Sequence, residues 1–457
     1  MLLNFKVKNY KSFVEEAELS MLAAPKQKGL DYSLMSGEVG RKKFKALSSA
    51  VIYGPNASGK TNIIGAMEVL KSIVLRGNIL NPENSTSPNA ALSNLELIPN
   101  CYTGLEPVSF YIDFYVTDAD DQAYRIQYEL EAVFGAFMDD EYLRKILDER
   151  LTVNEQLVFR RSEEHIEEIN VGPIKKYFSG ANANRLSELK EIAETGFSRD
   201  ELFLTNGFKL IFSPSFAKLI LEWFANKFTI IYRADSIHAV RLLASSDKGK
   251  LYVDSAVKEA AEIFGVNSNL LGYMENEDKD KDKGKGKGGA SLYSVIKTDE
   301  SGEYGVIKAE DFESYGTVRF VNLFPLISRA LKNGETLVID EFDASIHPVA
   351  LMNIVNIFHN DEVNIHHAQL IFNTHNPVFL NSNIYRRDEI KFVERDDETH
   401  QSVMYSLADF GTSGDKGVRK GEDYMNGYFV NRYGAIKDID FTPLFKEMLG
   451  INKEEQL

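Results

Sequence analysis

The hydrophobic and polar positions near the two ends of the chain predict strands that alternate with helices. Residues 2–8 alternate as in a half-buried strand, and the apolar run 50–53 stops at a glycine-containing loop that precedes apolar positions at helical spacing. Further along, the short apolar runs 337–339, 370–372 and 390–393 are typical of buried strands separated by helical stretches. Strands that alternate with helices usually form a parallel sheet, so we expect an α/β fold.

The middle of the chain follows another pattern. Residues 108–116 and 124–130 alternate between apolar and polar side chains, which predicts neighbouring antiparallel strands, continued by 157–160. Residues 185–265 are mostly helical by period, without the sustained heptads of a long coiled coil. We therefore expect an antiparallel β subdomain and a mostly helical insertion within the α/β domain.

Two segments predict loops. Residues 81–89 are rich in Asn, Ser and Pro. Residues 275–289 contain five acidic residues, five lysines and no apolar residue. Because such a segment cannot offset its ordering entropy by burial, it predicts a disordered surface loop, either a plain linker or a tether for a partner.

Composition and charge narrow the class of protein. The 457 residues are 44% hydrophobic and 26% charged, which allows a sizeable core and excludes a wholly disordered or collagen-like chain. Cys101 is the only cysteine, which excludes an intrachain disulfide, and no apolar run approaches the ~18 residues of a membrane helix. We therefore expect a cytoplasmic protein without a membrane partner. The net charge of -16 argues against an extensive basic surface for nucleic acid.

A phosphate-binding motif, G-x-x-x-x-G-K-[ST], lies between the predicted strand 50–53 and the helix after it. Its residues are Gly54, Pro55, Asn56, Ala57, Ser58, Gly59, Lys60 and Thr61, and Asn62 follows directly. The glycines allow the backbone N–H groups to surround a β-phosphate at the positive end of the helix dipole. Lys60 would reach the β- and γ-phosphates, and the Thr61 hydroxyl would ligate Mg²⁺. The motif therefore predicts a nucleoside triphosphate site.

Asp340 and Glu341 end the apolar strand 337–339. At the C-terminal edge of a parallel sheet they would face the ligand crevice, where Asp340 would hold Mg²⁺ and Glu341 would polarise the attacking water. Two acids at a strand end are also a common helix cap, and the upstream phosphate loop favours the catalytic interpretation. His375 follows the strand 370–372 and would sense the γ-phosphate from the same edge, although a lone histidine is usually structural. The other histidines show no metal-site spacing, so Mg²⁺ is the only metal that we expect.

Ser314, Gly316 and Thr317 precede a predicted helix over residues 318–331. A Ser-x-Gly turn at a helix start offers a hydroxyl and backbone amides to an anion. The signal is weak by itself, because Ser and Gly begin many helices.

Taken in order, the phosphate loop, the Ser-x-Gly turn, the Asp-Glu strand end and the strand-borne histidine resemble the ABC-type ATPase head of SMC proteins and recombination ATPases. The resemblance implies a head-to-tail dimer or higher oligomer that closes around two ATP molecules. Ser314, Gly316 and Thr317 would then contact the partner's γ-phosphate in trans, and Asp343 would lie at the dimer contact. The turn after the first strand, 2–8, would lie near the adenine.

The whole chain also resembles the bacterial RloA-like or AbiL-type group of AAA family ATP-binding proteins. The matching stretches are residues 53–62, 313–317, 340–348, 372–376 and 427–435. This resemblance implies an antiphage, abortive-infection ATPase that controls a separate effector encoded nearby, a TOPRIM-like nuclease or an RloB-type protein, with a phage protein as a candidate trigger. Glu313 and Tyr315 stand where transporters have Leu and Gly, as is typical of this group.

The resemblance divides the chain into four parts: the N-terminal half of the head (1–134), the insertion (135–300), the C-terminal half of the head (301–400) and an extension (401–457). A DNA-repair or recombination ATPase that binds DNA directly is the alternative. We do not expect a fused TOPRIM nuclease, since only 82 residues follow His375. A transporter subunit is disfavoured by the large insertion and by the form of the Ser-x-Gly motif.

Overall fold

The computed structural model describes most of the chain. The described residues are 1–25, 27, 29–80, 96–135, 144–178, 185–232, 250–252, 259, 270–275, 290–297, 304–412, 417–437 and 439–449. The predicted loop at 81–89, and that at 275–289 apart from its first residue, lie outside them.

A six-stranded sheet forms the centre of the α/β part, in the order β11-β16-β17-β5-β18-β19. All neighbours are parallel except β19, which is antiparallel to β18. The strands are β5 Ser49–Tyr53, β11 Phe228–Ile231, β16 Thr336–Ile339, β17 Gln369–Asn373, β18 Ile390–Arg395 and β19 Ser402–Ser406. The predicted α/β fold with a parallel sheet is therefore confirmed.

The prediction that residues 185–265 are mostly helical did not identify the strand β11 within that range. This run of four largely apolar residues extends the central sheet beside β16. A short apolar run has the same pattern in a buried strand as in a buried helical segment, so periodicity alone could not separate them.

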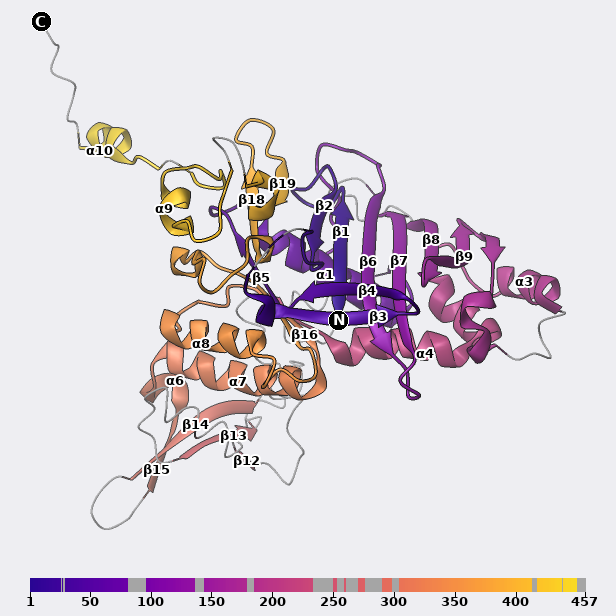
Figure 1. The fold of residues 1–457 in the computed structure, drawn as a ribbon, viewed down its shortest axis with the longest axis horizontal. Helices are drawn as coiled ribbons and strands as arrows, with labels where there is room; N and C mark the ends of the chain where they lie inside the picture. Colours follow the sequence, from indigo (N-terminus) through magenta and orange to yellow (C-terminus); the bar gives the residue numbers. More distant parts are fainter. Residues whose placement is uncertain are drawn as a thin grey trace, which may run out of the picture.

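Helices cover both faces of the central sheet. Helix α1 (Lys60–Arg76) packs between one face and the antiparallel subdomain in a shared hydrophobic core. Helices α7 (Tyr315–Asn333) and α8 (Pro348–His359) pack against the opposite face in a second core, visible below the sheet in Figure 1. This burial on both faces explains the continuous apolar runs of the parallel strands.

The antiparallel subdomain is a seven-stranded sheet in the order β10-β9-β8-β7-β6-β1-β2. Its strands are β1 Leu2–Lys8, β2 Ala17–Ser20, β6 Val108–Thr117, β7 Ala123–Val133, β8 Lys145–Val153, β9 Gln156–Ser162 and β10 His165–Ile169. The antiparallel pairing of β6 with β7 confirms that prediction. The sheet continues across the expected boundary at residue 134, because β8 pairs with β7.

The remaining elements surround these two sheets. Strands β3 Leu34–Val39 and β4 Lys42–Leu47 form a hairpin. A four-stranded sheet consists of β12 Lys250–Tyr252, β13 Leu270–Glu275, β14 Ala290–Lys297 and β15 Tyr304–Lys308. The other α-helices are α3 Leu186–Glu194, α4 Pro214–Glu222, α6 Ala309–Phe312, α9 Tyr424–Phe429 and α10 Thr442–Met448. The π-helical segments are η4 Leu204–Phe212 and η5 Trp223–Lys227. The 3₁₀ turns are η1 Asp31–Ser33, η2 Gly172–Tyr177, η7 Pro377–Phe379, η8 Arg387–Glu389 and η9 Leu407–Phe410. Within the described part of the chain, no helix has the length and apolar character needed to cross a membrane.

Candidate functional site

The phosphate loop connects β5 to α1, as the sequence predicts. A Cβ on Gly54 would lie 2.2 Å from the carbonyl oxygen of Val393. At Gly59, which has a φ of 110°, a Cβ would lie 2.8 Å from the hydroxyl oxygens of both Ser12 and Ser402. Both positions therefore require glycine, because the neighbouring chain leaves no space for a side chain.

Lys60 is the first residue of α1, and only 5% of its surface is exposed. Its Nζ donates to the carbonyl oxygens of Gly54 at 2.7 Å and Pro55 at 2.9 Å. Burial lowers the Lys60 pKa to about 8, although the nearby carboxylates of Asp340 and Glu341 act to raise it. The ammonium therefore lies against the loop, within the field of two acids and next to the backbone that would hold phosphate.

Thr61 and Asp340 meet at the edge of the sheet. The Thr61 hydroxyl donates to Asp340 Oδ1 at 3.1 Å. Asn373, at the end of β17, donates from its side-chain amide to the same oxygen. A hydroxyl and a carboxylate oxygen next to a phosphate loop are the ligand types that Mg²⁺ takes with a nucleotide, so these residues fit that ion. Among the described residues, no group of three or more His, Cys, Asp or Glu side chains forms a separate metal site.

Glu341 follows Asp340 in the left-handed region, with a φ of 51°, and its side chain is exposed. Its backbone N–H donates to the Asn373 side-chain oxygen. Asn373 therefore connects both acids to β17, the strand between the phosphate-loop strand and the acidic strand. This arrangement leaves the Glu341 carboxylate free to reach solvent beside a buried Asp340.

His375 lies two residues beyond β17 and is exposed. Partial desolvation of the imidazole nevertheless lowers its pKa, and the Lys60 charge lowers it further, while Asp343 and Asp340 act to raise it. At neutral pH the histidine is therefore mainly neutral, the form that can accept or donate one hydrogen bond.

The Ser-x-Gly turn begins α7. Ser314 caps the helix by accepting from the Thr317 backbone N–H at 3.1 Å, and the two hydroxyl oxygens lie 2.8 Å apart. A Cβ on Gly316 would lie 2.1 Å from the carbonyl oxygen of Ser345, so only glycine allows this approach. The start of α7 therefore rests on the turn that follows Glu341 in the same chain.

Sequence reasoning missed several polar residues that hold the phosphate loop. Ser402, at the start of β19, donates to the carbonyl oxygen of Ser58 at 2.6 Å. Asn62 donates to the hydroxyl of Ser12 at 2.8 Å. Ser12 lies in the turn after β1, so that turn reaches the phosphate loop. The family resemblance covered residues 372–376 and the turn that holds Ser12, but the contacts of Ser12, Ser402 and Asn373 could not be predicted, because they join distant segments.

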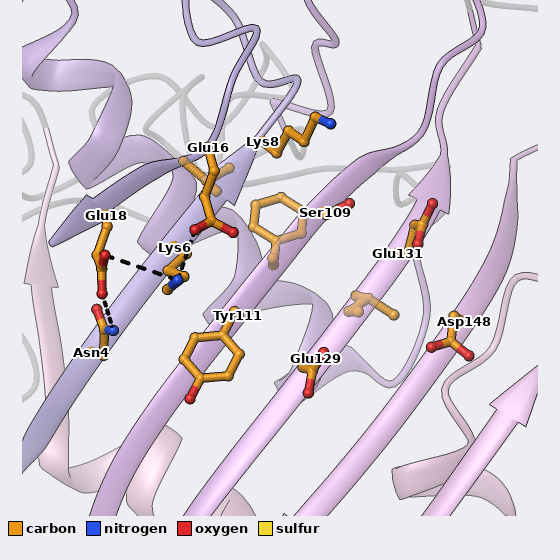
Figure 2. Close-up of a pocket in the computed structure, with 13 residues that line it drawn as sticks. Asn4, Lys6, Lys8, Glu16, Glu18, Ser109, Tyr111, Glu129, Glu131 and Asp148 are labelled. Atoms are coloured by element: carbon orange, nitrogen blue, oxygen red, sulfur yellow. Dashed lines mark hydrogen bonds and ion pairs between the residues drawn. The ribbon is translucent and has the colours of Figure 1, made fainter. Parts of the chain in front are cut away.

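A hollow of about 510 Å³ lies over the antiparallel sheet, away from the phosphate loop. Figure 2 shows Lys6 on β1 near Glu16 and Glu18, and Glu129 on β7, which is separated from β1 by β6. Lys6 Nζ pairs with Glu16 at 2.7 Å and lies 3.9 Å from Glu18. Exposed pairs of this kind contribute little, and no predicted site residue lines the hollow.

Comparison with known proteins identifies a family. The family model "AAA domain, putative AbiEii toxin, Type IV TA system" matches residues 49–381, which include the phosphate loop, both acids and His375. Among curated proteins, none matches the sequence. A similar solved structure is the SMC head domain from Thermotoga maritima, with 13% identity over 89% of this chain and 98% of that chain and a TM-score of 0.35. This score is too low to assign a fold, which rests instead on the sheet topology and the family.

Proposed function

This chain belongs to the family of AAA domains described as a putative AbiEii toxin of a type IV toxin–antitoxin system, and we propose that it is an ATPase that regulates a separate effector. Family membership supports nucleotide hydrolysis. The finer roles, given below to individual residues and partners, are our proposal. We place the protein in the cytoplasm, as a member of the RloA-like or AbiL-type antiphage group.

The contact between Thr61 and Asp340 beside Lys60 is the observation that carries the proposal. The backbone of residues 54–62 would hold the triphosphate, and Thr61 and Asp340 would hold Mg²⁺. Bound Mg²⁺ would supply charge neutralisation at the phosphate oxygens. The exposed carboxylate of Glu341 would orient a water molecule and accept its proton. His375, which is mainly neutral, would donate a hydrogen bond to the γ-phosphate.

Self-association is the next part of the proposal. Ser314 is exposed at the start of α7, where the helix N-terminus favours an anion. We propose that Ser314, Gly316 and Thr317 contact the γ-phosphate held by a second copy in a head-to-tail dimer. Asp343 would then lie at the contact between the two copies, next to the nucleotide.

The effector and the trigger are proposed on the resemblance and on the family description. A TOPRIM-like nuclease or RloB-type protein encoded nearby is the proposed effector, and a phage protein the proposed trigger. We place recognition of these partners in the insertion, residues 135–300, outside the strand β11 that completes the central sheet. The ATP-bound dimer would hold the effector in one state, and ATP hydrolysis would release the effector from that state.

The test is size-exclusion chromatography with light scattering on the Glu341→Gln protein, with and without MgATP. The variant keeps the shape of the side chain but cannot accept a proton, so an ATP-bound dimer should persist. The same runs include short duplex DNA and the protein encoded by the adjacent gene. Glu398→Gln, at an exposed position on the loop before β19, is the matched control.

An ATP-dependent dimer that co-elutes with the neighbouring protein and not with DNA is the expected result. ATP-dependent DNA binding without a protein partner would instead favour the repair-type alternative. A Glu341→Gln protein that hydrolyses ATP as fast as the control would refute the assignment of Glu341.

A further inference from the structure

Arg319 lies on the second turn of α7 and is only 2% exposed. Its Nη2 donates to the backbone carbonyl of Glu341. Within the described part of the chain, its Nε and Nη1 have no hydrogen-bond partner. A buried guanidinium that is only partly hydrogen-bonded costs stability, so its presence points to a role other than folding.

The backbone of Glu341 is held on both sides. Its N–H donates to the side chain of Asn373, and its C=O accepts from Arg319 and, at 3.2 Å, from the backbone N–H of Ala344. The φ of 51° is unfavourable for a residue with a Cβ, so surrounding contacts must maintain it. Asn373 on β17 and Arg319 on α7 are the two side chains among those contacts, and the backbone N–H of Ala344 is a third.

Helix α7 touches the same loop at a second point. The backbone of Gly316 approaches the carbonyl oxygen of Ser345 so closely that a Cβ would lie 2.1 Å from it. Ser314, two residues earlier, caps the helix and is exposed. A movement of the first turn of α7 towards the Glu341 loop would therefore clash at Gly316, and the next turn is bonded to the same loop through Arg319.

We propose that Arg319 is a positioning residue for Glu341. It holds the backbone of Glu341 so that the carboxylate meets the attacking water, and it links the exposed start of α7 to the hydrolytic carboxylate of the same chain. This inference rests on the proposed function, which assigns that water to Glu341. Because Arg319 would not touch the nucleotide, ATP binding should not depend on it, whereas turnover should.

The experiment compares two arginine-to-methionine variants on α7. Arg319→Met keeps much of the side-chain length and removes the donors and the charge. Arg329→Met is the matched control, because Arg329 bonds to Thr229 at 2.8 Å and pairs with the buried Glu335 at 3.1 Å. Loss of Arg329 leaves the Glu335 charge buried and unpaired.

Opposite results are expected from the two variants. Arg319→Met should lower kcat about tenfold or more, because the carboxylate of Glu341 is no longer positioned. KM and the Kd of a fluorescent ATP analogue should change less than about twofold. Tm should be unchanged or higher, because a partly bonded buried charge is removed. Arg329→Met should lower Tm and leave kcat unchanged. Arg319→Lys, which keeps a charged donor, should recover part of the lost kcat.

Amide hydrogen exchange gives a readout that does not need activity. Arg319→Met should exchange faster over residues 340–347 than the wild type or Arg329→Met does. Equal exchange, or a kcat within twofold of an active wild type, would overturn the inference. So would a fall in Tm as large as that of Arg329→Met without a loss of kcat. If the methionine variant does not fold, the same measurements on Arg319→Lys test the inference.

A wild type that does not hydrolyse ATP would refute the proposed function. The exchange measurement would still test whether Arg319 positions the backbone of Glu341.

Discussion

The Thr61 hydroxyl donates to Asp340 Oδ1 at 3.1 Å, which joins the start of α1 to the end of β16 across 279 positions of sequence. This contact brings the two predicted Mg²⁺ ligands together at one edge of the central sheet. The strand between β5 and β16 is β17, which contributes Asn373 to the same oxygen. The contact therefore supports one composite site rather than two separate motifs.

Asp340→Asn should raise the Mg²⁺ concentration needed for half-maximal ATP hydrolysis at least about tenfold, because the site loses the charge that attracts the ion. Removal of Mg²⁺ with a chelator should abolish hydrolysis in the wild type. The measurement is the initial rate against free Mg²⁺ at fixed ATP. Asp361→Asn, at an exposed position after α8, is the control. An unchanged Mg²⁺ requirement in Asp340→Asn would remove Asp340 from the metal site.

ATP affinity should depend on pH through Lys60, whose pKa burial lowers to about 8. Bound phosphate favours the charged ammonium, so the pKa of Lys60 must be higher in the complex. Below pH 8 the amine is already protonated, and Kd should be constant. Above pH 8 binding must take up a proton, so affinity should fall by up to about tenfold per pH unit.

Calorimetry in two buffers of different ionisation enthalpy checks this directly, since proton uptake should rise between pH 7 and pH 9. Lys60→Arg, which stays charged, should show no such rise if it still binds. Lys60→Ala should bind ATP at least about tenfold more weakly, because a charged hydrogen-bond donor is lost. A wild-type Kd that stays flat up to pH 9.5 would contradict the role of Lys60.

The features that could be predicted are those that depend on residues close together in the sequence. The phosphate loop, the strand before it and the helix after it occupy one continuous segment, so residue types and period identify them. Asn373 could not be predicted in the same way, because an asparagine at a strand end acquires its role only when β17 lies between β5 and β16. The contact of Arg319 with Glu341 likewise depends on the packing of α7 against the sheet.

The boundary of the antiparallel subdomain was hidden for the same physical reason. Strands β6, β7 and β9 were visible as alternating segments, but alternation does not reveal which strand pairs with which. The pairing of β7 with β8, and of β11 with β16, comes from burial against distant elements. The candidate site residues could therefore be proposed from short motifs, whereas the order of the strands could not.

Gly316→Ala should lower the rate of hydrolysis about tenfold or more, because the new Cβ would lie 2.1 Å from the Ser345 carbonyl oxygen. The first turn of α7 must then move away from the loop after Glu341. Nucleotide binding, measured with a fluorescent ATP analogue, should be largely retained, since the phosphate loop is not altered. Gly196→Ala is the control, because its Cβ would make only an ordinary contact of 3.5 Å. Normal hydrolysis by Gly316→Ala would show that the start of α7 can move without affecting Glu341.

Glu149→Leu should destabilise the protein by about 3–5 kcal/mol, because it breaks a buried ion pair from one side. Glu149 and Arg161 are both fully buried on neighbouring strands of the antiparallel sheet, with Glu149 Oε2 at 3.4 Å from Arg161 Nη1. The Glu149 carboxylate also accepts from the backbone N–H groups of Phe203 at 2.6 Å and Leu204 at 2.9 Å. Leucine would leave the guanidinium and both N–H groups without this acceptor.

Urea unfolding monitored by circular dichroism measures the loss, and Glu167→Leu on β10, which is exposed, is the control. Because Glu149 lies in the antiparallel sheet and not at the phosphate loop, the folded fraction of Glu149→Leu should still bind ATP with normal affinity. Arg161 also donates to the backbone carbonyl of Ser198 at 3.1 Å and to two other backbone carbonyl groups. If the free energy of unfolding of Glu149→Leu lies within about 1 kcal/mol of the wild type, these carbonyl acceptors are sufficient for Arg161. The carboxylate would then be dispensable for the stability of this sheet.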